Sequence, residues 1–155
     1  AGWTFCDESA ERAHEMASRY IGGYFETVLD HYNFASDHLA KTKGYEYYGK
    51  MAEKIAQYGA GTVTDFFTNL QVWGTPEQCY AKVLDIRDRV GNETFVGVFS
   101  YAGMPYDAAE RNMRLFAREV MPALQKLGRE RRPADPAAVA ARQAGKELDV
   151  GLLGT

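Results

Sequence analysis

The stretch Thr94-Phe95-Val96-Gly97-Val98-Phe99-Ser100 decides the fold class, because every residue between its two hydroxyl-bearing ends is apolar or glycine. A strand with one face in water alternates apolar and polar residues, whereas this stretch has no polar face. It therefore predicts a strand buried on both sides, as in a parallel sheet or barrel covered by helices. A helix here, or a strand with one side in water, would contradict that interpretation.

A second strand is predicted at the start of the chain, over Gly2-Trp3-Thr4-Phe5-Cys6. Asp7 follows at once and is a plausible helix N-cap, because its carboxylate can accept hydrogen bonds from free backbone amides. Apolar residues then recur at spacings of three and four, which predicts a helix to about His31. Within it, Gly22-Gly23 would allow either the close approach of another backbone or a bend.

The clearest local signal is Gly74-Thr75-Pro76-Glu77-Gln78. Thr75 is the predicted N-cap, Pro76 suits the first helical position, and Gln78 completes a capping box. The helix that starts here is expected to stop at Gly91-Asn92.

A further helix is predicted from a cap at Asp107 to Leu127, with a kink or early end at Pro122, which lacks a backbone donor.

Residues 32–73 form an aromatic, turn-rich insertion with a short helix at 47–58; residues 62–73 are expected to be irregular or helical. Residues 128–155 are rich in Arg, Pro and Ala, and we expect a flexible or loosely docked tail.

The element order is strand, helix, insertion, helix, strand, helix. Such alternation is typical of an α/β fold with a parallel sheet or barrel. A complete (β/α)8 barrel needs roughly 200–250 residues, and this chain has 155. Residues 1–127 are therefore interpreted as βα units that are incomplete on their own. Their strands would pair with an upstream portion, a separate chain or a second copy, and the missing initiator methionine is consistent with processing or truncation.

The composition and charge of the chain limit the kinds of partner that we expect. Hydrophobic residues make up 46% and charged residues 25%, an ordinary globular balance, and the net charge is −3. Basic residues do not cluster before the tail, so neither nucleic acid nor an anionic membrane is expected as a partner. No signal peptide or membrane-spanning run is visible, which predicts a cytoplasmic protein. Cys6 and Cys79 are far apart in sequence and are expected to be reduced, buried thiols.

An ordered set of segments resembles the C-terminal end of the luciferase-like flavin-dependent monooxygenases, over about residues 3–127. The segments are Gly74-Thr75-Pro76-Glu77-Gln78, Asp85-Ile86-Arg87, Phe95-Val96-Gly97-Val98-Phe99, Ala102-Gly103-Met104-Pro105, Ala109-Glu110-Arg111, Met113-Arg114-Leu115-Phe116-Ala117 and Glu119-Val120-Met121-Pro122, with His31-Tyr32 and Gly44-Tyr45-Glu46-Tyr47-Tyr48-Gly49 resembling a subgroup.

The resemblance implies a TIM-type barrel that binds reduced FMN, or the deazaflavin F420 in some relatives, and oxidises a small organic substrate, often with molecular oxygen. In that picture Trp3–Cys6 ends the seventh strand and Phe95–Phe99 is the eighth. The first six strands of the family are absent here, and with them most groups expected to hold the flavin. The sequence also leaves open a non-catalytic, self-associating module without a cofactor.

Active sites of such barrels lie where strands end at their carboxyl side. After the second predicted strand, Ser100, Tyr101, Gly103 and Met104 are the candidates for the cofactor, and Gly103 would let backbone approach a ligand. After the first strand, Thr4, Cys6 and Asp7 lie at the same end, and Thr4 and Cys6 are predicted to contact the substrate. An ordinary βα turn explains each of these residues equally well, and no catalytic residue is assigned.

Tyr45, Tyr47 and Tyr48 are further substrate candidates, because aromatic insertions suit apolar ligands; alternatively, they pack the insertion onto the barrel. Glu11-x-x-His14 has the spacing of a di-iron helix motif. That site needs a second such pair, and no other histidine follows a glutamate at this spacing, so no metal is expected.

Overall fold

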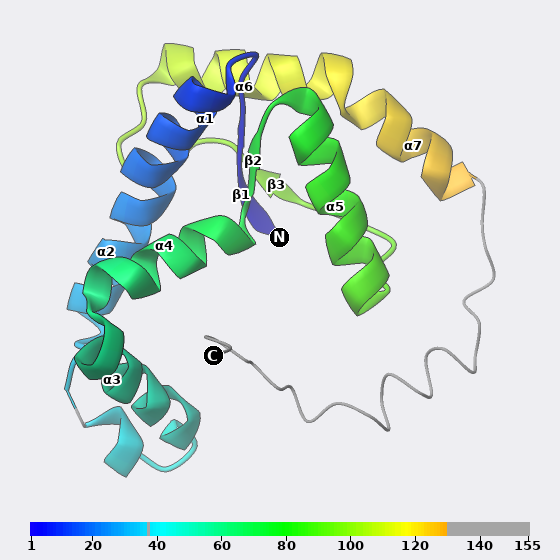
Figure 1. Ribbon diagram of the computed structural model, residues 1–155. Helices are drawn as coiled ribbons and strands as arrows, with labels where there is room; N and C mark the ends of the chain where they lie inside the picture. Colours follow the sequence, from blue (N-terminus) through cyan, green and yellow to red (C-terminus); the bar gives the residue numbers. More distant parts are fainter. Residues whose placement is uncertain (37, 130–155) are drawn as a thin grey trace.

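The computed structural model describes residues 1–36 and 38–129, and within them the chain is an α/β protein. Helices predominate and surround one small sheet of parallel strands, which confirms the predicted α/β class with a parallel sheet (Figure 1). The predicted tail falls almost wholly on residues 130–155, which lie outside the described residues. No helix of the described part is both long enough and apolar enough to cross a membrane.

The sheet has three strands in the order β2-β1-β3, so the first strand of the chain is the central one. β1 is Gly2–Cys6, β2 is Val72–Gly74 and β3 is Gly97–Val98. β1 runs parallel to both neighbours, with Thr4 opposite Val72 on one edge and Gly2 opposite Gly97 on the other. The predicted strand at 2–6 is therefore confirmed.

β2 is a strand that the sequence did not predict, because residues 62–73 were expected to be irregular or helical packing structure. The helical part is α4, Ala60–Leu70, and the chain then turns directly into the three residues of β2. Three residues are too few to show an alternating pattern. Only their pairing with Thr4, Phe5 and Cys6 makes them a strand.

The connection that leaves β1 starts with one continuous helical rod, which ends at His31 as predicted. It consists of α1 (Ala10–Met16), a π-helical segment η1 (Ala17–Gly22) and α2 (Gly23–His31). A Cβ atom on Gly22 would lie 3.3 Å from Cγ2 of Thr64 in α4. The glycine therefore allows a close approach, as predicted, although a side chain rather than a backbone approaches it.

The N-cap of this rod is Ser9 and not Asp7 as predicted. The Ser9 hydroxyl accepts a hydrogen bond from the Arg12 amide, at 3.1 Å. Asp7 lies two residues too early to reach that amide, and its carboxylate accepts instead from the Ser9 amide, at 2.9 Å. The acidic residue thus shapes the turn before the helix.

The insertion is a helical layer that packs on the far part of the rod. It contains a short 3-10 turn η2 (Leu39–Lys41), then α3 (Glu46–Tyr58) and α4. The predicted helix over 47–58 is confirmed to within one residue. Phe25 of α2 and Phe67 of α4 stack with ring centroids 4.0 Å apart, and they belong to the apolar cluster that joins the insertion to the rod.

The two remaining helical regions carry the connections to and from β3. α5 is Pro76–Val90 with the predicted capping box of Thr75 and Gln78 in place, and Gly91 ends it in the left-handed conformation. α6 (Tyr106–Glu119) and α7 (Met121–Arg129) meet at the break predicted near Pro122. Asp107 does not cap α6 as predicted, because the helix already begins at Tyr106.

Helices cover both faces of the sheet, and Figure 1 shows α1 and α5 on either side of the strands. Phe5 points toward α1 and the start of α6, whereas Cys6, the next residue, points toward α5 and the rest of α6. A central first strand with crossovers on opposite faces is the local order at the switch point of an open doubly wound sheet.

β3 differs from its prediction in length and in burial. Only Gly97 and Val98 pair as a strand, and the side chains of Val96 and Val98 are 56% and 36% exposed, while Phe95 and Phe99 are half-buried. The expected burial on both sides is therefore wrong for this chain, because no element of the described residues covers the outer face of this edge strand. The exposed positions are valines, so the wet face is apolar.

Candidate functional site

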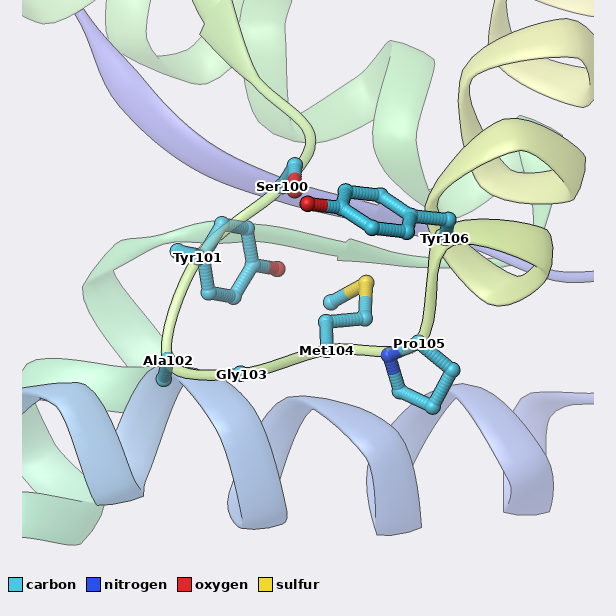
Figure 2. A pocket seen from close by; sticks show the side chains of 7 residues that line it. All are labelled: Ser100, Tyr101, Ala102, Gly103, Met104, Pro105 and Tyr106. Carbon is cyan, nitrogen blue, oxygen red and sulfur yellow. The ribbon is translucent and has the colours of Figure 1, made fainter.

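The loop between β3 and α6 encloses a hollow at the carboxyl end of the sheet (Figure 2). It has a volume of about 420 Å³, is open to solvent, and is lined by the residues from Ser100 to Tyr106. Ser100, Tyr101, Gly103 and Met104, the four predicted cofactor residues, all line it. The structure therefore brings this predicted set together at one place.

A tight turn forms the outer rim of the hollow. The Met104 amide donates to the Tyr101 carbonyl, at 2.9 Å, and the two residues between them have positive φ angles, 51° at Ala102 and 70° at Gly103. Glycine adopts this conformation freely, but for alanine it costs on the order of 1 kcal/mol. A Cβ on Gly103 would meet no atom within 4 Å, so the space beside this backbone is open.

Tyr101 fastens the loop to the central strand. Its hydroxyl donates to the Thr4 carbonyl oxygen, at 3.1 Å, and its ring is half-buried at the side of the hollow. Burial raises the pKa of Tyr101. The hydroxyl therefore stays protonated at neutral pH and keeps its role as a donor.

Asn112 of α6 makes the backbone hydrogen bonds at the place where β1 and β3 separate. Its side-chain oxygen accepts from the Cys6 amide, at 2.7 Å, and its nitrogen donates to the carbonyls of Thr4, at 2.9 Å, and of Phe99, at 3.4 Å. β3 has ended at Val98, so these backbone groups have no ladder partner on this side. The fully buried amide takes over the function of the missing ladder.

Asn112 is a site residue that was not predicted from the sequence, although the sequence contains a signal for it. Asn112 lies three residues after Ala109 and four before Phe116, both of which belong to the buried stripe of α6. A polar residue on the apolar face of a helix must find a hydrogen-bond partner there, because an unpaired buried amide is costly.

Thr4 and Cys6, the predicted substrate residues of β1, lie in the core. Both side chains are almost completely buried, and the Thr4 hydroxyl donates to the Gly2 carbonyl, at 3.2 Å. Cys6 belongs to the apolar cluster beneath α5. Neither side chain lines the hollow, so a ligand there does not reach them without movement of the loop.

Asp7 is the charged residue at the carboxyl end of β1. Its amide donates to the Gly74 carbonyl, and the Arg12 guanidinium donates to its carboxylate, with Nε 2.7 Å from Oδ2. Burial acts to raise the pKa of Asp7, but hydrogen bonds from Arg12 and from the Ser9 amide, with the charges of Arg12 and Arg111, lower it by more. The carboxylate is therefore ionised at neutral pH and already paired.

The predicted substrate tyrosines of the insertion are not brought to the hollow. Tyr45 immediately precedes α3 and Tyr48 lies inside it; both are exposed, with ring centroids 6.1 Å apart. α3 packs on η2 and α4, and in Figure 1 it lies beyond α2, away from the loop at the start of α6. Tyr47 belongs to the same helix. Tyr45 and Tyr48 form a separate aromatic surface with Phe34.

No three His, Cys, Asp or Glu side chains within residues 1–36 and 38–129 gather closely enough to hold a metal ion. Glu11 and His14 both lie on α1, and the His14 ring packs edge-on against Trp73 at 5.4 Å. An aromatic contact of this kind accounts for the position of the histidine.

Comparisons of this chain with protein-family models, with curated proteins and with solved structures find no match. The resemblance to luciferase-like monooxygenases therefore stays a prediction.

The residues of the hollow fit a flavin in part. Tyr101 and Tyr106 provide rings and Met104 a thioether, which suit a planar aromatic ligand. Gly103 leaves room for close contact with the backbone. No lysine or arginine is among the lining residues, so a phosphate would find only the free amides in the first turn of α6.

Proposed function

We propose that this chain is the C-terminal part of a flavin-dependent oxidoreductase of the luciferase-like kind, which binds its flavin against the loop from Ser100 to Tyr106. The observation that carries the proposal is the hollow at the carboxyl ends of β1 and β3, lined by all four residues that were predicted to contact the cofactor from their place after the strand. FMN is the proposed cofactor and F420 the alternative.

Two architectures lead to the same position for the ligand. In a (β/α)8 barrel, active sites lie at the carboxyl ends of the strands, and phosphate sites often follow the seventh and eighth strands. In an open doubly wound sheet, ligands bind outside the carboxyl ends at the switch point, which here lies between β1 and β3. The proposed site therefore does not depend on which of these sheets the complete protein forms.

The proposal requires further strands, and the two edges of the sheet differ in their capacity to accept them. No strand within the described residues pairs with the outer edge of β3, and its apolar face has Val96 and Val98 exposed, which suits an added strand and a covering layer. On the other edge, β2 already pairs with Thr4, Phe5 and Cys6. The preceding strand of a barrel would therefore have to pair with the outer edge of β2, or displace β2 from the edge of β1.

The bound flavin would supply the redox chemistry, by accepting or passing electrons between an organic substrate and oxygen. The residues of this chain would hold and orient it. Tyr101, fixed by its hydrogen bond to Thr4, gives a rigid wall, and the open backbone at Gly103 allows an edge of the ring system to approach. The two free thiols are consistent with the proposed cytoplasmic location.

Flavin binding is tested by the quenching of FMN and F420 fluorescence, with the chain alone and with the remaining strands supplied. Ser100→Trp fills the exposed rim of the hollow, and we expect it to weaken binding about tenfold or more, which corresponds to about 1.4 kcal/mol. Ser18→Trp, on the exposed side of η1, is the matched control and should bind as the wild type does. Failure of the completed protein to bind either flavin would overturn the proposal.

One observation favours a second function, a non-catalytic module that associates with itself. Leu70, Val90, Val96 and Val98 are all exposed, and the first two line a second hollow, of about 320 Å³, beside β3. A second copy of the chain would bury this apolar surface without any cofactor. A colourless, stable homo-oligomer by light scattering that leaves flavin fluorescence unchanged would favour this function over the first.

A further inference from the structure

Tyr101 and Tyr106 both line the hollow, but the structure holds the two rings very differently. The Tyr101 ring is half-buried, and its hydroxyl donates to the Thr4 carbonyl. Tyr106 is 89% exposed, the largest exposed fraction among the large hydrophobic side chains whose burial the structure describes. No hydrogen bond or ring contact joins its side chain to another of the described residues. One wall of the hollow is therefore fixed, and the other is free to move.

The backbone beneath Tyr106 is anchored. Tyr106 is the first residue of α6, and the Ala109 amide donates to the Pro105 carbonyl, at 3.0 Å. Ala108 and Ala109 are buried in the apolar cluster that contains Met104. The Tyr106 ring can therefore change its position by rotation about its two side-chain torsions, while the helix stays in place.

The Tyr106 ring lies where it can cover a molecule in the hollow. Figure 2 shows it extending from the start of α6, with its hydroxyl end toward Ser100 and with Met104 between the two tyrosine rings. No Lys, Arg, Asp, Glu or His is among the lining residues. Such a hollow favours a flat, uncharged aromatic group, because aromatic rings stack on each other and a thioether packs well against a ring.

We propose that Tyr106 is a stacking residue that closes over the bound ligand. Its ring turns onto the outer face of a flat, uncharged aromatic ring system whose inner side rests against Tyr101 and Met104. This inference rests on the proposed function, in which that ring system belongs to the flavin. A tyrosine suits this role because it buries a large apolar area and has only two side-chain torsions to order.

The exposure of Tyr106 separates its effect on binding from its effect on folding. A side chain that is 89% exposed contributes little to the free energy of unfolding, so its removal should leave the fold unchanged. Loss of stacking on one face of the ligand should weaken binding about tenfold. Phenylalanine keeps the ring and should bind within about twofold of the wild type.

The test titrates the full chain with FMN and, in parallel, with F420, alone and with the remaining strands supplied, and follows the quenching of flavin fluorescence. Tyr106→Ala should bind about tenfold more weakly than the wild type, and Tyr106→Phe nearly as the wild type does. Tyr32→Ala, at an exposed tyrosine just after α2, is the matched control and should leave binding unchanged. Tyr106→Ala should also unfold at the same urea concentration as the wild type.

The failure of this inference and the failure of the proposed function are distinguishable. If the wild type binds a flavin and Tyr106→Ala binds it equally well, the stacking inference is overturned and the proposed function stands. Unfolding of Tyr106→Ala at a clearly lower urea concentration would show that the ring supports the fold, and would also overturn the inference. If the wild type binds neither flavin, even with the remaining strands supplied, the proposed function is overturned and this inference with it.

Nitration by tetranitromethane gives a second measurement that needs no variant. Tyr106 should react readily in the free protein, because its ring is exposed, and a saturating concentration of FMN should protect it. Tyr32 should react equally with and without FMN. Mass spectrometry of the peptides distinguishes Tyr106 from Tyr101 by their fragments. Equal nitration of Tyr106 in the free and the FMN-bound protein would overturn the inference.

Discussion

The side-chain nitrogen of Asn112 lies 2.9 Å from the carbonyl oxygen of Thr4, while the oxygen of the same amide accepts from the Cys6 amide at 2.7 Å. One helix residue thus bonds two backbone groups on the same edge of β1. A neighbouring strand would normally supply these bonds, but β3 ends at Val98. The separation of the two strands, which opens the candidate site, therefore depends on α6.

Asn112→Leu keeps the volume of the side chain and removes both functions of the amide. The Cys6 amide then has no acceptor in the core, although the Thr4 carbonyl keeps its bond from Tyr101. We expect a loss of about 3 kcal/mol in the free energy of unfolding, measured by urea denaturation. Asn69→Leu, at an exposed position of α4, is the control and should change it by less than about 0.5 kcal/mol. Equal effects of the two variants would contradict the structural role of Asn112.

Ala102→Gly should stabilise the protein. The alanine has a φ of 51°, a conformation that glycine adopts without strain, and relief of that strain outweighs the greater entropy of an unfolded glycine. We expect a gain of about 0.5 kcal/mol by urea denaturation. Ala81→Gly, on the exposed side of α5, should have the opposite sign and cost about 1 kcal/mol. Destabilisation by both variants would show that the turn is not strained as described.

Stability at acidic pH should depend on Asp7. The folded protein holds the pKa of this carboxyl below its ordinary value, so the unfolded chain binds the proton more tightly. The stabilising effect is therefore complete above the ordinary value of about 4 and is lost as the pH falls through the folded value. Asp7→Asn should reduce the drop in melting temperature between neutral and acidic pH, measured by circular dichroism. Asp65→Asn, at an exposed aspartate of α4, should leave the wild-type drop unchanged.

Val96→Lys should separate folding from association. Because Val96 is 56% exposed, a lysine there should change the free energy of unfolding by less than about 0.5 kcal/mol. A charge beside the free edge of β3 should, however, oppose the addition of another strand. Light scattering at increasing concentration should then show weaker self-association than in the wild type. Thr62→Lys, an exposed position of α4, controls for the added charge; association unaffected by Val96→Lys would exclude this edge as the contact.

Local features were the most predictable part of the fold. The capping box of Thr75 and Gln78, the end of the rod at His31 and the break near Pro122 all depend on groups within four residues of each other. Where the N-cap prediction failed, at Asp7 and Asp107, the chain offered several capping residues or a proline nearby. Which of these neighbouring residues becomes the N-cap depends on the direction in which the preceding strand or loop enters the helix.

The candidate site was predictable only in part. The loop from Ser100 to Tyr106 was expected because it follows an apolar stretch and precedes a helix. Thr4 and Cys6 were expected near the ligand because they end a strand, yet their side chains point into the core. Alternation along a strand says which residues share a face, but not what covers that face.

By itself, the sequence determined that this protein is an α/β chain with helices at defined positions around short apolar strands. Apolar periodicity and helix capping involve residues within one or two helical turns of each other, so they can be recognised from the sequence alone. Only the tertiary structure decided that β2 exists, that β1 lies between β2 and β3, that Val96 faces water and that Cys6 and Cys79 belong to one buried cluster. Each of these depends on backbone hydrogen bonds or side-chain contacts between segments distant along the chain, which form only when the crossovers bring those segments together.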